Sequence, residues 1–311
     1  MRVRTRAVAT GFVVLVLIAA IGMIVVLRQA GEGLRLPLAG RACTVQADGE
    51  VTLDSQQMAN AATIAAIGVQ REMPERAVVV ALATAYQESG LRNLTGGDRD
   101  SVGLFQQRPS QGWGTPAQIR DPRYAAGKFY AALKKVRGWE DMRVTDAAQK
   151  VQRSAFPEAY EKWADESQVL TRALLGHATT AVTCTVGGDP VLRGAAAIAA
   201  LTEGLALDWG LVAASSGEDR PTGTGYFSSA VDSYGNPTLL KVGIDGLSTS
   251  PEGVRAGWRY AHWLVSHAKQ NGVKRVAFDG REWTAKRGDW KRLAESERGD
   301  TEVLAEVHED V

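Results

Sequence analysis

The sequence predicts a mainly α protein: an N-terminal transmembrane helix, an α-helical domain and then a small α+β domain. Three observations lead to this fold class. Residues 7–27 contain no charged residue. Residues 55–177 contain several segments in which apolar side chains recur at helical spacing. Beyond residue 190, two helical segments are followed by two short alternating strands.

The composition is that of a globular protein and gives no sign of a nucleic-acid partner. The 311 residues are 45% hydrophobic and 23% charged, which allows about two domains besides the N-terminal helix. The net charge is only +1. The basic pairs Lys134-Lys135 and Lys286-Arg287 are typical of solvated faces rather than of phosphate-binding patches.

The N-terminal segment predicts a membrane anchor. Residues 7–27 are long enough to cross a bilayer as a helix. Arg28 follows directly and no small-residue cleavage site is present, which favours an uncleaved signal anchor. The dense positive charge of residues 1–6 favours that end as a cytoplasmic stub. We therefore expect a single-pass cell-membrane protein with extracytoplasmic soluble domains, joined to the anchor by a linker over residues 28–42.

The two cysteines stand at the ends of the helical domain, which we place at residues 43–186. Cys43 and Cys184 share the context Cys-Thr-Val, one just before and one just after the helical segments. The soluble domains are expected outside the cytoplasm, where disulfides persist. We therefore expect a disulfide between Cys43 and Cys184 that joins the ends of this domain. The alternative is two separate buried thiols, the usual environment of a free cysteine.

The helical domain is expected to begin with two helices. Asp54 suits the N-cap of a helix from Ser55 to about Arg71. Pro74 suits the first position of the next helix, and Gly90 suits the left-handed residue after its end. Glu88 lies in the last turn of this second helix and is held rigidly if the apolar face docks in a core. Further helices are expected over residues 123–136, 145–154 and 157–177.

Two motifs in this domain resemble the paired signature of the soluble lytic transglycosylases of the lysozyme-like superfamily. They are Glu88-Ser89-Gly90 and Gly103-Leu104-Phe105-Gln106, separated by a polar loop. The segment 121–130 is similar to the helix that follows the sugar-cleft segment in that family. Phe105 replaces the usual Met, and the third signature, Ala-Tyr-Asn, is absent. The nearest substitute for the Ala-Tyr-Asn signature is residues 148–157. The resemblance to the family covers about residues 50–175.

The resemblance implies a peptidoglycan lytic transglycosylase with Glu88 as its single catalytic acid. Such an enzyme cleaves the MurNAc-GlcNAc bond without water and leaves a 1,6-anhydromuramoyl end, whereas hydrolysis normally takes two carboxylates. Peptidoglycan glycan strands are the implied partner. The residues that it implies for substrate binding are Ser89, Gly103, Leu104, Phe105, Gln106, Gln107, Tyr124, Gln152 and Tyr160.

Two alternatives stay open at this point. Asp98 and Asp100 provide candidate second carboxylates for a lysozyme-type hydrolase. The missing Ala-Tyr-Asn signature also fits a membrane-tethered, non-catalytic wall-binding protein, although a pure binder needs no acid at Glu88. No cofactor and no metal are predicted, because His262 and His267 are five residues apart and do not share a helical face. No protein partner is indicated.

The second domain, residues 190–311, follows a break at Gly187-Gly188-Asp189-Pro190. Residues 215–250 are rich in Gly, Ser, Thr and Asp, and no element is assigned there. The acidic tail after Ser296 is expected to fray. The elements expected are a helix over residues 194–207, a helix from Ser250 to Gly272, and strands 273–278 and 281–284 around an Asp279-Gly280 turn. The hairpin is weakly similar to an accessory domain of actinobacterial cell-wall hydrolases.

Overall fold

The computed structural model describes residues 42–154, 156, 158–214, 223, 225–231, 237–244, 250–294 and 302–310. They belong to one compact unit, Arg41–Val311, whereas the unit Met1–Gly40 lies outside the described residues. The predicted stub and anchor also lie outside them. The prediction of a single-pass membrane location is not borne out within the ranges just given, where no helix is long and apolar enough to cross a bilayer.

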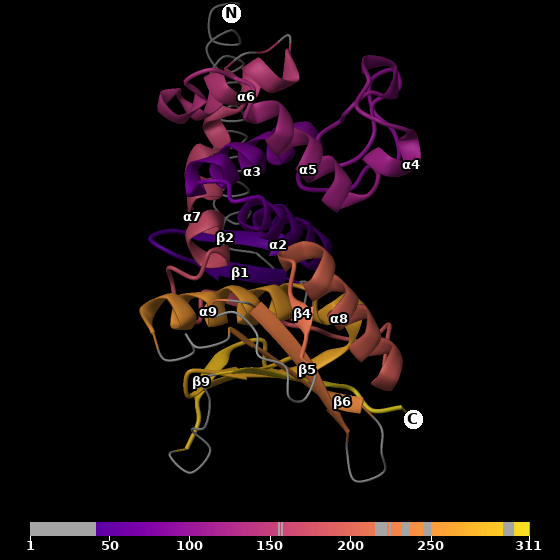
Figure 1. Ribbon diagram of the computed structural model, residues 1–311, viewed down its shortest axis with the longest axis vertical. Coiled ribbons are helices and arrows are strands. Elements are labelled where there is room, and N and C mark those ends of the chain that lie inside the picture. The colour runs from indigo at the N-terminus through magenta and orange to yellow at the C-terminus, as the bar shows by residue number, and fades with distance from the viewer. Residues whose placement is uncertain are drawn as a thin grey trace, which may run out of the picture. The chain divides into compact units, whose positions relative to one another are not determined.

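The fold is α+β, and the prediction of a mainly α protein is wrong. The described strands form a three-stranded sheet, in the order β2-β1-β3, and a seven-stranded mixed sheet, in the order β4-β5-β6-β10-β7-β8-β9. In the larger sheet β4 and β5 are parallel and the other pairs are antiparallel. Helices α8 and α9 pack on this sheet, and α2 packs on those two helices (Figure 1).

The first half of the unit contains the small sheet and most of the helices. Local signals explain the first two helices: Asp54 caps α2 with a reciprocal capping box, and Gly90, at a φ of 62°, ends α3 as predicted. The last helix starts later than expected, after a 3-10 turn over Glu161–Trp163. The elements are β1 (Ala42–Gln46), β2 (Glu50–Asp54), α2 (Ser55–Gln70), α3 (Glu75–Ser89), α4 (Pro116–Ile119), α5 (Pro122–Leu133), α6 (Val144–Gln152), α7 (Ala164–Leu174) and β3 (Val182–Cys184).

The predicted disulfide between Cys43 and Cys184 is confirmed. The two cysteines face each other in the register of β1 and β3, so the bond joins neighbouring strands of the small sheet. This sheet was not expected from the sequence, and it brings together the two ends of the stretch 43–184.

The second half of the unit contains the large sheet. The predicted hairpin is present as β7 and β8, but two sequence expectations fail. The stretch 215–250 supplies β5 and β6, and part of the acidic tail forms β10, a central strand with Val303, Ala305 and Val307 buried. The elements are α8 (Gly194–Trp209), β4 (Val212–Ala213), β5 (Gly225–Val231), β6 (Pro237–Ile244), α9 (Pro251–Ser266), α10 (Ala268–Asn271), β7 (Val273–Phe278), β8 (Arg281–Thr284), β9 (Trp290–Arg292) and β10 (Val303–Val307).

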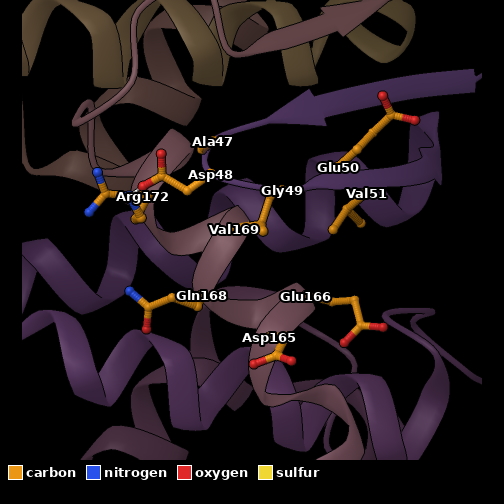
Figure 2. Close-up of a pocket in the computed structure, with 10 residues that line it drawn as sticks. All are labelled: Ala47, Asp48, Gly49, Glu50, Val51, Asp165, Glu166, Gln168, Val169 and Arg172. Carbon is orange, nitrogen blue, oxygen red and sulfur yellow. Dashed lines mark ion pairs between the residues drawn. The ribbon is translucent and has the colours of Figure 1, made fainter.

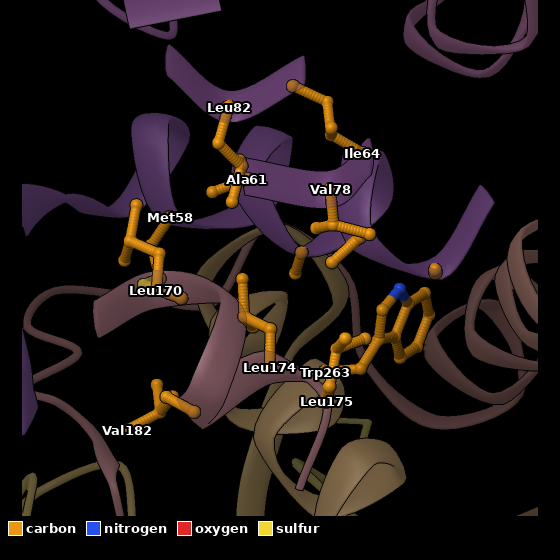
Figure 3. Packing of buried hydrophobic residues seen from close by; sticks show 14 of the residues in the cluster. Met58, Ala61, Ile64, Val78, Leu82, Leu170, Leu174, Leu175, Val182 and Trp263 are labelled. Carbon is orange, nitrogen blue, oxygen red and sulfur yellow. The ribbon is translucent and has the colours of Figure 1, made fainter. Parts of the chain in front are cut away.

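One hydrophobic core extends through both halves. Figure 3 shows Met58, Leu82 and Leu170, from α2, α3 and α7, in the same cluster as Trp263 of α9. All four side chains are almost completely removed from solvent. The parts predicted as separate domains, 43–186 and 190–311, therefore stabilise each other by sharing apolar burial.

Candidate active site

Glu88 lies at the end of a helix that is rigidly held in the core. The face of α3 from Ala77 to Tyr86 is buried, and Glu88 is the next-to-last residue of the helix, half-buried at its end. The hydroxyl of Tyr160 donates a hydrogen bond to Oε1 of Glu88 at 2.7 Å. The structure thus brings together two residues that the sequence separates by 72 positions.

Tyr160 is suited to remain a hydrogen-bond donor. Its side chain is 0% exposed. Burial, and then the negative charge of Glu88, raise the pKa of Tyr160 far above neutral pH, although a hydrogen bond with Ser154 opposes this shift. The phenol therefore stays protonated and orients the Glu88 carboxyl group.

The segment 103–105 is tied to two helices through neighbouring carbonyl groups. Ser89 Oγ donates to the Leu104 carbonyl oxygen at 2.7 Å and also lies 3.0 Å from the Ala85 carbonyl oxygen. Gln152 Nε2, at the end of α6, donates to the Phe105 carbonyl oxygen at 2.8 Å. Hydrogen bonds therefore link the segment 103–105 both to Ser89, the residue after Glu88, and to Gln152 of the substitute for the third motif.

The side chains of this segment are part of the core. Gly103 has a φ of 78°, and a Cβ at this position would lie 2.6 Å from the Ile119 carbonyl oxygen, so only glycine fits. Leu104 and Phe105 are fully buried, and Phe105 stacks on Phe129 with ring centroids 4.9 Å apart. Leu104 and Phe105 thus contribute backbone carbonyl groups near the site and apolar side chains to the core.

The two glutamines after Phe105 bond within the protein. Gln106 has a φ of 45°; its Nε2 donates to the Gly103 carbonyl oxygen at 3.1 Å, and its Oε1 accepts from Ser101 Oγ at 2.9 Å. Gln107 is buried, and its Nε2 donates to the Ala125 carbonyl oxygen of α5 at 3.2 Å. Both side chains hold the shape of the loop in this structure.

Tyr124 supports the same loop at Trp113. Its hydroxyl donates to the Trp113 carbonyl oxygen at 3.1 Å, and Lys128 Nζ lies 5.3 Å from its ring centroid. We use the name Gly103 loop for residues 103–113. Helix α5 contacts this loop near both ends, and Tyr124 makes the contact at Trp113.

The two aspartates suggested for a hydrolase are not paired with Glu88. Asp98 has a side chain that is 92% exposed, with Arg99 Nε 3.9 Å away. Asp100 accepts from Arg108 Nε at 2.8 Å and from the backbone N–H of Ser110 at 2.8 Å. The Arg108 guanidinium, and then Ser110, hold the pKa of Asp100 well below its usual range. Asp100 is therefore an ionised group that organises the loop.

Sequence reasoning missed the aromatic pair that supports Tyr160. Tyr86 and Trp163 stack with centroids 4.8 Å apart, and Trp163 Nε1 donates to Gln87 Oε1 at 3.1 Å. Trp163 is three residues after Tyr160, so the stack fixes the turn that presents the phenol to Glu88. No local pattern indicates these contacts, because Trp163 is 76 positions from its hydrogen-bond partner Gln87 and further still from Tyr86.

A separate pocket lies between the β1–β2 turn and α7 (Figure 2). It has a volume of about 580 Å³ and contains none of the predicted site residues. Within it Asp48 and Arg172 form an ion pair at 2.8 Å. The described residues include no cluster of three or more His, Cys, Asp or Glu side chains that could hold a metal ion. The carboxylates that line the pocket are Asp48, Glu50, Asp165 and Glu166.

No protein-family model matches the chain, and no curated protein matches it.

Proposed function

We propose that the protein is a peptidoglycan lytic transglycosylase of the lysozyme-like superfamily, with Glu88 as its single catalytic acid. The observation that supports this most is the contact between Glu88 and Tyr160, beside the segment that Ser89 and Gln152 hold. A half-buried carboxyl group with one fixed donor keeps a defined orientation and still has an oxygen that a substrate can reach.

The proposed reaction needs one carboxyl group and no water. Glu88 gives its proton to the leaving oxygen as the MurNAc C1–O bond breaks. The Glu88 carboxylate then takes the proton of the C6 hydroxyl of the same MurNAc, and that oxygen bonds to C1. The acid is restored, and the product carries a 1,6-anhydro end. Tyr160 keeps the carboxyl group oriented through both steps.

The arrangement of the aspartates favours this reaction over hydrolysis. Water-dependent glycosidases use a second carboxylate as a base or nucleophile beside the scissile bond. Asp100 is held by Arg108 and Ser110, and Asp98 is on the surface.

The test is the mass of the muropeptides that the purified chain releases from peptidoglycan. We expect products one water lighter than those of a hydrolase. Glu88→Gln should lower release by about 100-fold or more, in the range seen for removal of a general acid. Its thermal midpoint should stay unchanged, because the new group is nearly isosteric.

A matched control is Glu203→Gln, the same change at an exposed glutamate of α8. This variant should keep full release. Reducing ends in place of anhydro ends would show a lysozyme-type hydrolase. Binding to peptidoglycan without any release would show a non-catalytic wall-binding protein.

A further inference from the structure

Asp208, near the end of α8, is a buried carboxylate that joins four helices. Its side chain is 0% exposed. Oδ1 accepts a hydrogen bond from Arg123 Nε of α5. Oδ2 accepts from Trp263 Nε1 of α9 at 2.8 Å and from Thr63 Oγ1 of α2 at 3.0 Å. Through Asp208 the second half of the unit therefore makes a directed contact with α5.

Arg123 is in the first turn of α5, the helix that supports the Gly103 loop. The next residue, Tyr124, donates to the Trp113 carbonyl oxygen, and Ala125 accepts from Gln107. One turn further, Phe129 stacks on Phe105. Helix α5 thus contacts the loop at several points along the length of the loop, so a rotation of this helix would move the whole loop.

An ion pair of this kind fixes the orientation of its side chains more than it raises the unfolding free energy. The attraction between the charges is largely offset by the loss of their hydration, so apolar residues of the same volume often stabilise a protein as well. A carboxylate with donors on both oxygens does, however, fix the direction of the guanidinium. The Arg123 side chain is 35% exposed, so without Asp208 it can turn to solvent.

We propose that Asp208 is a positioning residue for the Gly103 loop. By holding Arg123 it fixes the first turns of α5, and through them the loop whose Leu104 carbonyl meets Ser89 beside Glu88. The consequence for catalysis rests on the proposed function. The consequence for the loop does not, because it follows from the contacts alone.

Hydrogen exchange of the full chain, followed by mass spectrometry, tests the link to the loop. Asp208→Asn and Arg123→Gln should each raise the exchange rate in residues 103–113 by about 10-fold. The double variant should raise it no further, because both changes break one contact. Arg123→Lys should restore part of the protection. Arg259→Gln is the control, since Arg259 Nε of α9 donates to the Leu175 carbonyl oxygen at the end of α7 instead of reaching α5.

Unchanged exchange in residues 103–113 for both single variants, with a lowered thermal midpoint, would overturn the proposal and leave Asp208 a purely structural residue. An equal rise with Arg259→Gln would also overturn it, because the loop would then respond to any loosening. If Asp208→Asn does not fold, Arg123→Gln decides alone, since Arg123 is partly exposed.

Muropeptide release is the second measurement, and it tests the effect of Asp208 on catalysis. If the proposed function holds, Asp208→Asn should raise KM about 10-fold and leave the anhydro product unchanged. An inactive wild-type chain would end the proposed function but leave the exchange result standing. Faster exchange with wild-type KM would confine the role of Asp208 to the loop.

Discussion

Helices α3 and α8 end in the same way but place their acidic residues in opposite environments. Glu88 and Asp208 are each the last residue but one of their helix. Each helix is closed by a left-handed glycine, Gly90 at a φ of 62° and Gly210 at 71°. At both ends the helix dipole disfavours a negative charge, so the neighbouring donors decide what the carboxyl group does.

The difference lies in burial and in the number of donors. Asp208 is fully buried and accepts from a guanidinium, an indole and a hydroxyl. Among the described residues Glu88 has one donor, the phenol of Tyr160, and it is half-buried. A buried carboxylate with donors on both oxygens is a structural anchor. One with a single neutral donor can still exchange a proton with a substrate.

The largest expected effect that separates the two ends is on stability. Asp208→Ala leaves Arg123, Trp263 and Thr63 without their common acceptor in a buried site. The buried Trp263 N–H and Thr63 hydroxyl then lack an acceptor, which costs about 1–3 kcal/mol of unfolding free energy each, whereas the partly exposed Arg123 can turn to solvent. Glu88→Ala should cost less than about 1 kcal/mol, as is usual for a partly exposed residue. Denaturant unfolding of both variants measures this, and equal losses would mean that the two carboxylates have the same structural role.

Acid should weaken the α9 side of the molecule in particular. His262 of α9 is buried; its Nδ1 donates to the Ala173 carbonyl oxygen at 2.8 Å, and its Nε2 accepts from the Ala181 N–H at 3.1 Å. Burial lowers the pKa of His262 to about 4, although the bond to Ala173 opposes this. Burial also lowers the pKa of His267, whose ring stacks on Trp263 beside Asp208.

In the unfolded chain His262 takes up a proton below about pH 6.5. In the folded chain His262 stays neutral until the pH falls to about 4. The unfolding free energy has its full value, as far as His262 is concerned, above about pH 6.5. It decreases by about 3 kcal/mol as the pH falls from about 6.5 to about 4. Denaturant unfolding at several pH values should show this loss in the wild type and a shallower slope in His262→Gln. Parallel slopes for the two chains would contradict it.

The parts of the fold that the sequence predicts correctly are set by neighbouring residues. Asp54 and Gly90 mark helix boundaries because their side chain or backbone acts on the adjacent turn. The turn at Asp279-Gly280 likewise forms a hairpin from local chemistry. The cysteine pair was predictable from its matched context at the two ends of the helical stretch.

The parts that failed depend on distant partners. Residues 303–307 alternate buried and half-buried positions, but they lie in an acidic tail and become a strand only because β6 and β7 pair with both their edges. The contact between Tyr160 and Glu88 and the pair of Arg123 with Asp208 also join residues far apart in sequence. Motifs indicated which segments matter, and tertiary contacts decide which side chains face the site.

The smallest expected effect concerns the single donor at Glu88. Tyr160→Phe keeps the buried ring and removes only the hydroxyl. The loss of one hydrogen bond should lower the unfolding free energy by about 0.5–1.5 kcal/mol, near the low end because Glu88 can turn to water. If the proposed function holds, muropeptide release should fall about 10-fold, the equivalent of one such bond, because the carboxyl group loses its orientation.

Tyr130→Phe is a matched control for this change. Tyr130 is also fully buried, and its hydroxyl donates to the Ile64 carbonyl oxygen at 2.9 Å, away from Glu88. It should cost a similar unfolding free energy and leave release unchanged. If both variants lower release equally, the Tyr160 hydroxyl acts only through stability. The Tyr160 hydroxyl would then have no specific effect on the orientation of Glu88. Glu88 and Asp208 would differ only in how deeply they are buried.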